Sequence, residues 1–280
     1  MQTLLAWVTP AFTSGSPVDH TWVTTYDSRT TKYETIADVI AAGQYNFYCW
    51  GDFHPVGKSD SHLGGLIGFA NADLGIAACI CKPNLDSRSN SEARGTIFIY
   101  GIDGVCHQLA NQILWSTGIN GSTPLSVREA RGFRASEAIY GTYGLQHSDW
   151  SDLCGKCSTA SSSSDVRRRG MTSTDKPKDQ FEEHARSVLL GAENAEEKLA
   201  SIQRLRGELR EYQSTAKTRA LGATERGGRD LADEINGRND QFFSAAARLL
   251  SPSEFKSLFG FEPSEKIQLV REDVVGKRVR

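Results

Sequence analysis

The stretch that most constrains the fold runs over residues 96–117, where a strand-like run, a glycine turn and a helical pattern follow one another. Residues 96–100 are all β-branched or aromatic, which favours an extended strand. The run stops at a turn containing Gly101 and Gly104. From Cys106 onward the apolar residues recur at helical spacing. We therefore predict a strand, a tight turn and then a helix with a cysteine at its N-terminus.

A cysteine in this position has a chemical use. The first backbone N–H groups of a helix have no partner within the helix, and the helix dipole favours negative charge there. Both effects lower the pKa of a thiol, so Cys106 is a candidate nucleophile. The N–H of Cys106 or of His107 could then stabilise an oxyanion. The alternative is a buried, inert cysteine, because cysteine is among the most buried residue types.

A cysteine nucleophile needs a general base, and the sequence offers six histidines. His20 directly follows an acidic residue and opens a predicted strand over residues 18–26. His54 and His62 lie in the region after a second predicted strand, over residues 44–50. The others are His107 beside the cysteine, His147 near a linker and His184 in the C-terminal helices. The residues alone leave the base open among these candidates.

The order of three segments resembles a known family. A strand opens with Asp-His-Thr-Trp-Val at residues 19–23, and an aromatic strand ends with Tyr-Cys-Trp-Gly-Asp-Phe-His-Pro at residues 48–55. A late cysteine then starts a helix. Over about residues 15–120, this order resembles the circularly permuted branch of the papain-like superfamily. That branch includes permuted NlpC-type peptidases and amidases and the lecithin:retinol acyltransferase-like enzymes.

The resemblance implies an α+β fold, with an antiparallel sheet and a nucleophile helix packed on it. It implies His20 as the base and Cys106 as the nucleophile. A polar residue on the neighbouring strand would orient the histidine, and a hairpin would bring Asp52 and His54 near His20. We rank Asp52 first, because a carboxylate stabilises an imidazolium by direct charge. The chain departs from many relatives at Val105, where an asparagine commonly stands.

The implied activity is that of a cysteine-dependent hydrolase, an amidase or peptidase that works through a thioester. Peptides or peptidoglycan fragments are the implied substrates, and the chemistry requires no cofactor and no metal. Gly101 and Gly104 would let a substrate backbone approach the site closely. Permuted papain-like enzymes are common among bacterial cell-wall hydrolases and secreted effectors. Export by a dedicated secretion system is therefore one option that the resemblance leaves open.

The composition changes along the chain. All five tryptophans lie before residue 151, and the stretch that follows is rich in serine and threonine. We predict a catalytic core over residues 1–157, a flexible linker over 158–177, a helical module over 178–260 and a charged, loose tail over 261–280.

Two apolar stripes at helical spacing make up the predicted module. The first predicts one long helix over residues 178–219, and the second, over 231–250, predicts its antiparallel partner. A glycine-rich turn over 222–228 joins them. The run Ser-Pro-Ser-Glu at residues 251–254 has the serine cap, the proline and the glutamate of a helix start. This module serves as a scaffold or contacts a protein partner.

The bulk properties exclude some classes of function. A net charge of −2 gives no field that would attract nucleic acid or an anionic membrane. No apolar run approaches the length of a transmembrane helix. The first residues lack the basic start of a secretory signal peptide, so we expect a cytoplasmic protein at synthesis. Six cysteines are too few for a disulfide scaffold, and we expect reduced thiols.

The rival to a cysteine hydrolase is a structural zinc site. The C-x-C and C-x-x-C pairs supply four thiolates, and Cys79 and Cys81 would share one face if residues 76–82 form a strand. The other pair is Cys154 and Cys157, and its distance from the first pair cannot be read from the spacing. A third possibility is a non-enzymatic interaction protein whose long helices contact a partner.

Overall fold

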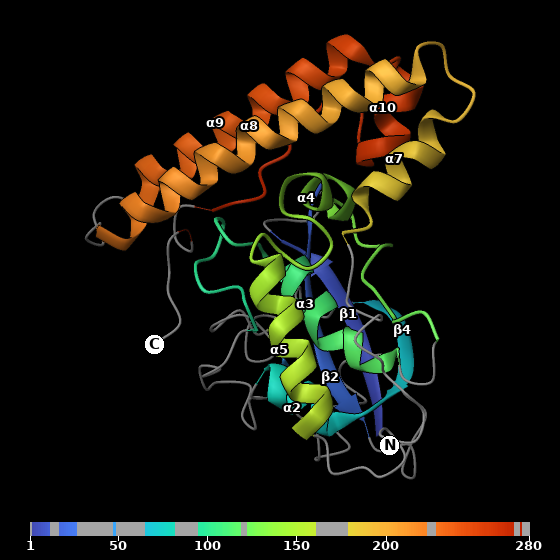
Figure 1. Ribbon diagram of the computed structural model, residues 1–280, viewed down its shortest axis with the longest axis vertical. Helices are drawn as coiled ribbons and strands as arrows, with labels where there is room; N and C mark the ends of the chain where they lie inside the picture. The colour runs from blue at the N-terminus through green and yellow to red at the C-terminus, as the bar shows by residue number, and fades with distance from the viewer. Residues whose placement is uncertain are drawn as a thin grey trace.

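The computed structural model describes residues 2–11, 17–26, 47–48, 65–81, 95–118, 122–160, 179–222, 228–271 and 275. These residues form an α+β fold, as predicted. A sheet and its covering helices make up one part, and long helices make up the other (Figure 1). Among the described helices, none has the length and apolar character needed to cross a lipid bilayer.

The sheet is antiparallel and has the strand order β3-β2-β1-β4. The strands are β1 (Gln2–Pro10), β2 (Asp19–Tyr26), β3 (Phe47–Tyr48) and β4 (Gly65–Ala72). The strand predicted at residues 18–26 is confirmed as β2, and β3 lies within the second predicted strand. Strand β1 was not predicted, yet it pairs with both β2 and β4. Trp7 and Trp22 are register partners on β1 and β2, and both are fully buried.

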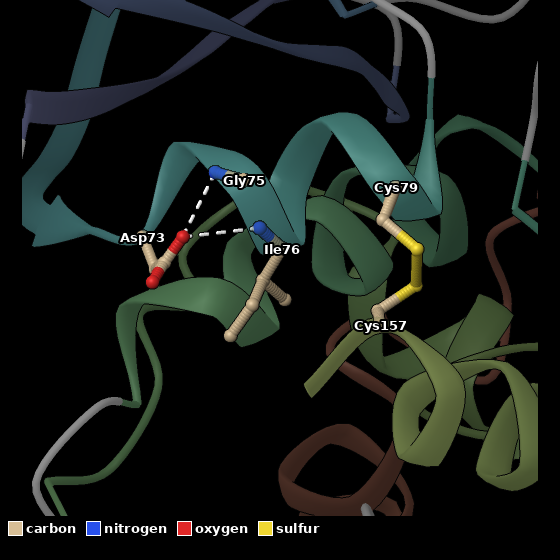
Figure 2. The surroundings of a disulfide bond; sticks show 5 residues. All are labelled: Asp73, Gly75, Ile76, Cys79 and Cys157. Carbon is tan, nitrogen blue, oxygen red and sulfur yellow. Dashed lines mark hydrogen bonds between the residues drawn. A yellow bond between two sulfur atoms is a disulfide. The ribbon is translucent and has the colours of Figure 1, made fainter. Parts of the chain in front are cut away.

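The strand predicted at residues 76–82 is wrong, because α2 (Leu74–Ile80) is a helix. The side chain of Asp73 accepts hydrogen bonds from the backbone N–H groups of Gly75 and Ile76 and caps the N-terminus (Figure 2). Ile76 and Ile80 are buried four residues apart, which is a helical spacing. A short apolar run of this kind cannot be assigned to a strand or a helix by periodicity alone.

The strand predicted at residues 96–100 is also wrong. The segment belongs to none of the four described strands; Thr96, Ile99 and Tyr100 form isolated β-bridges, and that of Tyr100 is to Gly104. Side chains also bind its backbone. The N–H of Thr96 donates to Oε1 of Gln112, and the N–H of Ile99 donates to Oδ2 of Asp103. Thr96, Ile97, Ile99 and Tyr100 are buried, whereas Phe98 is exposed.

The predicted helix over residues 106–117 is confirmed. It consists of α3 (Cys106–Leu114) and a 3₁₀ turn, η2 (Trp115–Thr117), and it ends at Gly118. Helix α3 is buried along its whole length and packs against β2. Helix α4 (Phe133–Tyr140) also contacts α3, and α5 (His147–Ala160) contacts α2.

The C-terminal helices differ from the prediction in one respect. The single helix predicted over residues 178–219 is two helices, α7 (Phe181–Leu189) and α8 (Ala195–Gly222). Gly191 and Asn194 between them have φ values of +80° and +56°, which end α7 and redirect the chain. The apolar stripe continues across the break because both helices bury it in the same cluster.

The predicted helical hairpin is confirmed by α9 (Gly228–Leu249), which lies beside α8 (Figure 1). Helix α10 (Pro252–Phe259) begins as predicted. The hydroxyl of Ser251 accepts from the N–H of Glu254, whose carboxylate accepts from the N–H of Ser251. Edge-to-face rings of α9, α10 and the following segment fill the core of this part; they are Phe242, Phe243, Phe255, Phe259 and Phe261.

The loose tail predicted from residue 261 is wrong for its described part, residues 261–271. Ile267, Leu269 and Val270 are buried there. The side-chain amide of Asn236 on α9 binds the backbone of Val270 through both its nitrogen and its oxygen. The apolar side chains between the charges bind this segment to the protein.

A partly buried ion pair joins the long helices to the core. Arg206 on α8 donates to the backbone oxygen of Ala138, in the last turn of α4, and to the carboxylate of Asp179. A cation at the C-terminal end of a helix interacts favourably with the helix dipole. The guanidinium also lies 4.1 Å from the ring centre of Phe181. Helix α8 is therefore fixed against α4 by charge and by packing.

Candidate active site

Cys106 is the first residue of α3 and follows Val105, which has extended backbone angles. The side chain of Gln108 accepts the N–H of Val105 at 3.1 Å, which satisfies one donor at the start of the helix. Cys106 is 5% exposed. Its sulfur is therefore nearly shielded from water and lies at the positive end of the helix.

His20 lies on β2 and reaches the sulfur of Cys106. The imidazole and the backbone N–H of Thr21 both interact with this sulfur, and both interactions lower the pKa of the thiol. The His20 ring also stacks on buried Trp22, with centroids 5.8 Å apart and planes 28° apart. The structure thus brings together the two residues that the resemblance implied as base and nucleophile.

The surroundings of Cys106 change its pKa in two directions. Burial raises the pKa, and this is the largest single effect. The charges of His20 and His107, together with hydrogen bonds from His20 and from the Thr21 backbone, lower it. The lowering effects outweigh burial, and the pKa is about 6. Cys106 is therefore mostly a thiolate at neutral pH.

Tyr100 is a member of this site that the sequence analysis missed. Its hydroxyl interacts with both the side chain and the backbone of Cys106. Burial and then the charge of Cys106 raise the pKa of Tyr100 well above its usual value, so the phenol stays protonated and can donate. The sequence signal was the position of Tyr100, five residues before the helix cap Val105, but the sequence analysis assigned this residue to a strand.

His107 has a structural place beside the nucleophile. It is fully buried, and its Nε2 lies 2.8 Å from the backbone oxygen of Asp19, while Nδ1 lies 2.8 Å from Oγ of Ser136. A carbonyl oxygen only accepts, so Nε2 carries a proton. His107 thereby joins α3 to the start of β2 and to α4. Both of its ring nitrogens have hydrogen-bond partners in these contacts.

Asp19, which precedes His20, does not orient the histidine. Its carboxylate accepts the backbone N–H of Arg131 and two side-chain hydrogen bonds from the same arginine, at 3.0 and 3.2 Å. Together with the bond from His107, these contacts fix the beginning of β2. The backbone next to His20 is therefore fixed by Arg131 and by His107 of α3.

The loop between residues 99 and 105 presents Cys106 and Tyr100 and is fixed by buried polar contacts. The carboxylate of Asp103 accepts the N–H of Ile99, the amide of Gln146 and the ammonium of Lys217, which comes from α8. A helix outside the sheet domain therefore stabilises the loop that carries the nucleophile.

The two glycines of this loop are required by the protein's own packing. Gly101 has a φ of +80°, and a Cβ there would lie 2.7 Å from Val270. A Cβ on Gly104 would lie 2.8 Å from Ile97. The expectation that these glycines make room for a substrate is thus not supported, because Val270 and Ile97 occupy the space.

The prediction of reduced thiols is wrong for one pair. Cys79 on α2 and Cys157 on α5 form a disulfide (Figure 2). Cys81 and Cys154 are buried, reduced thiols. Burial raises the pKa of the Cys154 thiol far above its usual range, which is the opposite of the shift at Cys106.

The disulfide also bears on the zinc alternative. That reading required four thiolates, and two of them are joined to each other. Within the described ranges, no group of three or more histidine, cysteine, aspartate or glutamate side chains is arranged to hold a metal ion.

The third member of the predicted triad cannot be placed. Asp52 and His54 both lie outside the described residues. Which of the two orients His20 stays a prediction.

Three comparisons with known proteins were made. No protein-family model matches the chain, no curated protein matches it, and no solved structure matches it.

Proposed function

We propose that this protein is a cysteine-dependent hydrolase of amide bonds, an amidase or peptidase, in which Cys106 is the nucleophile and His20 the general base. One observation carries the proposal. Cys106 heads a buried helix, and the imidazole of His20 interacts with its sulfur and, with the other nearby groups, lowers the thiol pKa to about 6. Perturbation of this kind is typical of catalytic cysteines.

The mechanism is acyl transfer through a thioester. His20 takes the thiol proton, and the sulfur of Cys106 attacks the carbonyl carbon of the substrate and forms a carbon–sulfur bond. The oxyanion accepts hydrogen bonds from the N–H of Cys106 and the hydroxyl of Tyr100. The intermediate collapses, the carbon–nitrogen bond breaks, and the leaving amine takes the proton from His20.

Water completes the reaction. His20 removes a proton from water, and the hydroxide attacks the thioester carbon. The carbon–sulfur bond then breaks, which releases a carboxylic acid and restores the thiolate–imidazolium pair. Asp52 or His54 would orient His20 through both halves of the cycle.

Peptides and peptidoglycan fragments are the proposed substrates, on the resemblance to the permuted papain-like branch described above. The disulfide supports the proposal that the protein acts in a compartment more oxidising than the bacterial cytosol, because disulfides are rare where thiols are kept reduced. This agrees with a protein that is made in the cytoplasm and exported by a dedicated system. The long helices α8 and α9 would then serve delivery or contact with a protein partner.

The proposal is tested by incubating the purified protein with peptidoglycan-derived peptides and following new amines and shortened peptides by mass spectrometry. We expect hydrolysis by the wild type, none by Cys106→Ala and a large loss in His20→Ala. Cys81→Ala is the matched control, because it removes another buried thiol. Hydrolysis that survives in Cys106→Ala would exclude the proposed mechanism.

A further inference from the structure

A cavity separate from the candidate active site lies beside the loop that carries Cys106. It has a volume of about 290 Å³ and is lined by Ile102 and Asp103 of that loop, by residues 141–146, by Asp179 and by α8. None of Cys106, His20 or Tyr100 lines it. Helix α8 contributes four polar residues at helical spacing along one face: Arg210, Gln213, Ser214 and Lys217.

Gln213 is the residue in this cavity that points to a ligand. Its side chain is only 2% exposed, and neither its oxygen nor its nitrogen has a hydrogen-bond partner among the described residues. Buried polar groups in native proteins are nearly always paired, because an unpaired one is costly. A buried amide that lines a cavity and has both a donor and an acceptor unused is suited to a bound molecule.

The hydrogen-bond donors in the cavity favour a ligand that accepts hydrogen bonds. Asp103 already accepts three hydrogen bonds, and Asp179 accepts from Arg206, Arg210 and the backbone of Phe181. Lys217 donates one hydrogen bond to a described residue out of three that an ammonium can make. Arg210 donates one out of five. The hydrogen-bonding capacity that the described residues leave unused in this cavity therefore belongs to the donors, Arg210 and Lys217.

The charges in the cavity limit how negative the ligand can be. Two carboxylates and two cations line the cavity, so a phosphate dianion would be repelled by as many charges as attract it. A single carboxylate can bind the free N–H groups of Arg210 and Lys217. An amide beside it can pair with both atoms of the Gln213 amide.

We propose that this cavity binds a small molecule with one carboxylate and a neighbouring amide, the chemistry found at the C-terminal end of a peptide. The carboxylate lies between Arg210 and Lys217, and the amide pairs with Gln213. This site is separate from Cys106, and the proposal does not depend on the proposed hydrolase activity.

The test is calorimetric titration of the full-length protein with N-acetylglycine, with neutral N-acetylglycinamide and inorganic phosphate as comparison ligands. We expect saturable binding of N-acetylglycine with a Kd on the order of 1 mM, and much weaker binding of the other two. Gln213→Leu should weaken binding about tenfold, as should Arg210→Gln. Cys106→Ala, which alters the other site, should bind as the wild type does.

Two controls make the result decisive. Arg204→Gln removes an exposed arginine of α8 that pairs with Glu208, away from the cavity, and should leave binding unchanged. Gln213→Leu should melt no lower than the wild type, because the amide that it removes has no described partner. The proposal is overturned if N-acetylglycine gives no saturable heat, if phosphate binds as tightly, if Gln213→Leu binds equally well or if Cys106→Ala abolishes binding.

Discussion

Replacing His20 by alanine should move the ionisation of Cys106 to higher pH. In the wild type the thiol pKa is about 6, because the charges and hydrogen bonds around the sulfur outweigh the effect of burial. His20 supplies both the largest charge effect and a hydrogen bond. Without it, burial opposes only the weaker contributions of His107 and Thr21. We expect a pKa of about 8.5 or above, the value of an ordinary thiol.

The size of the effect on reactivity depends on the pH of the assay. At pH 7, a thiol of pKa about 6 is about 30 times more ionised than one of pKa 8.5. A more basic thiolate is also a stronger nucleophile, and a Brønsted slope of about 0.45 offsets roughly tenfold of this difference. The net difference at pH 7 is then only about twofold to threefold. At pH 5 the ionisation ratio is about 300, and the net difference is about 20-fold.

The assay is therefore the rate of Cys106 alkylation by iodoacetamide from pH 4.5 to 9.5, with the modified residue located by mass spectrometry. We expect an inflection near pH 6 in the wild type that disappears in His20→Ala. The thiolate forms as pH rises through the lowered pKa, so the wild-type rate increases between about pH 5 and 7. Identical profiles for the two proteins, both with an inflection near 8.5, would refute the pairing of Cys106 with His20.

Three other predictions concern the hydroxyl of Tyr100, the ion pair between Lys217 and Asp103, and the disulfide. Tyr100→Phe removes one oxyanion donor and should lower kcat about 100-fold, while the inflection of the alkylation profile stays near pH 6. Steady-state kinetics and the alkylation profile measure these two effects. An unchanged kcat would exclude Tyr100 as an oxyanion donor. Lys217→Met leaves the buried carboxylate of Asp103 with two of its three described donors, and should lower the free energy of unfolding in urea by about 2 kcal/mol. A decrease in the free energy of unfolding below about 0.5 kcal/mol would mean that the Lys217–Asp103 pair contributes no more than an exposed salt bridge. Removing the disulfide in Cys79→Ser with Cys157→Ser reopens a loop of 78 residues and should cost about 2–4 kcal/mol in the same assay. Equal stability of this variant and the oxidised wild type would contradict that estimate.

Local sequence signals placed Cys106 at the start of a helix and His20 at the start of a strand, whereas the choice of His20 among the six histidines came from the family resemblance. Cys106 follows a glycine turn and starts an apolar helical pattern, and His20 opens a run of β-branched and aromatic residues. Both signals are local, and both elements form where they were predicted. The helical cap at Ser251 was equally readable, because its hydrogen bonds join residues three apart.

The features that were missed depend on contacts between distant segments. The backbone N–H groups of Thr96 and Ile99 are bound by the side chains of Gln112 and Asp103, and composition alone does not show that a segment is bound in this way. Cys79 and Cys157 are far apart in the sequence, so spacing gave no reason to pair them. The residues of α8 that line the cavity beside the loop of Cys106 were part of a polar helix face, which in a sequence is indistinguishable from a solvated one.

The central claim is that Cys106 forms an acyl bond to its substrate, and trapping this bond tests it most directly. Wild-type protein would be mixed with peptidoglycan-derived peptides, quenched in acid within seconds and measured by intact-mass and peptide-level mass spectrometry. The account predicts a mass increase equal to the acyl part of the peptide, located on Cys106 and absent from Cys106→Ala. It also predicts that the adduct is lost on treatment with hydroxylamine, which cleaves thioesters. An adduct on Cys81 or Cys154, or peptide cleavage without any dependence on Cys106, would contradict the account.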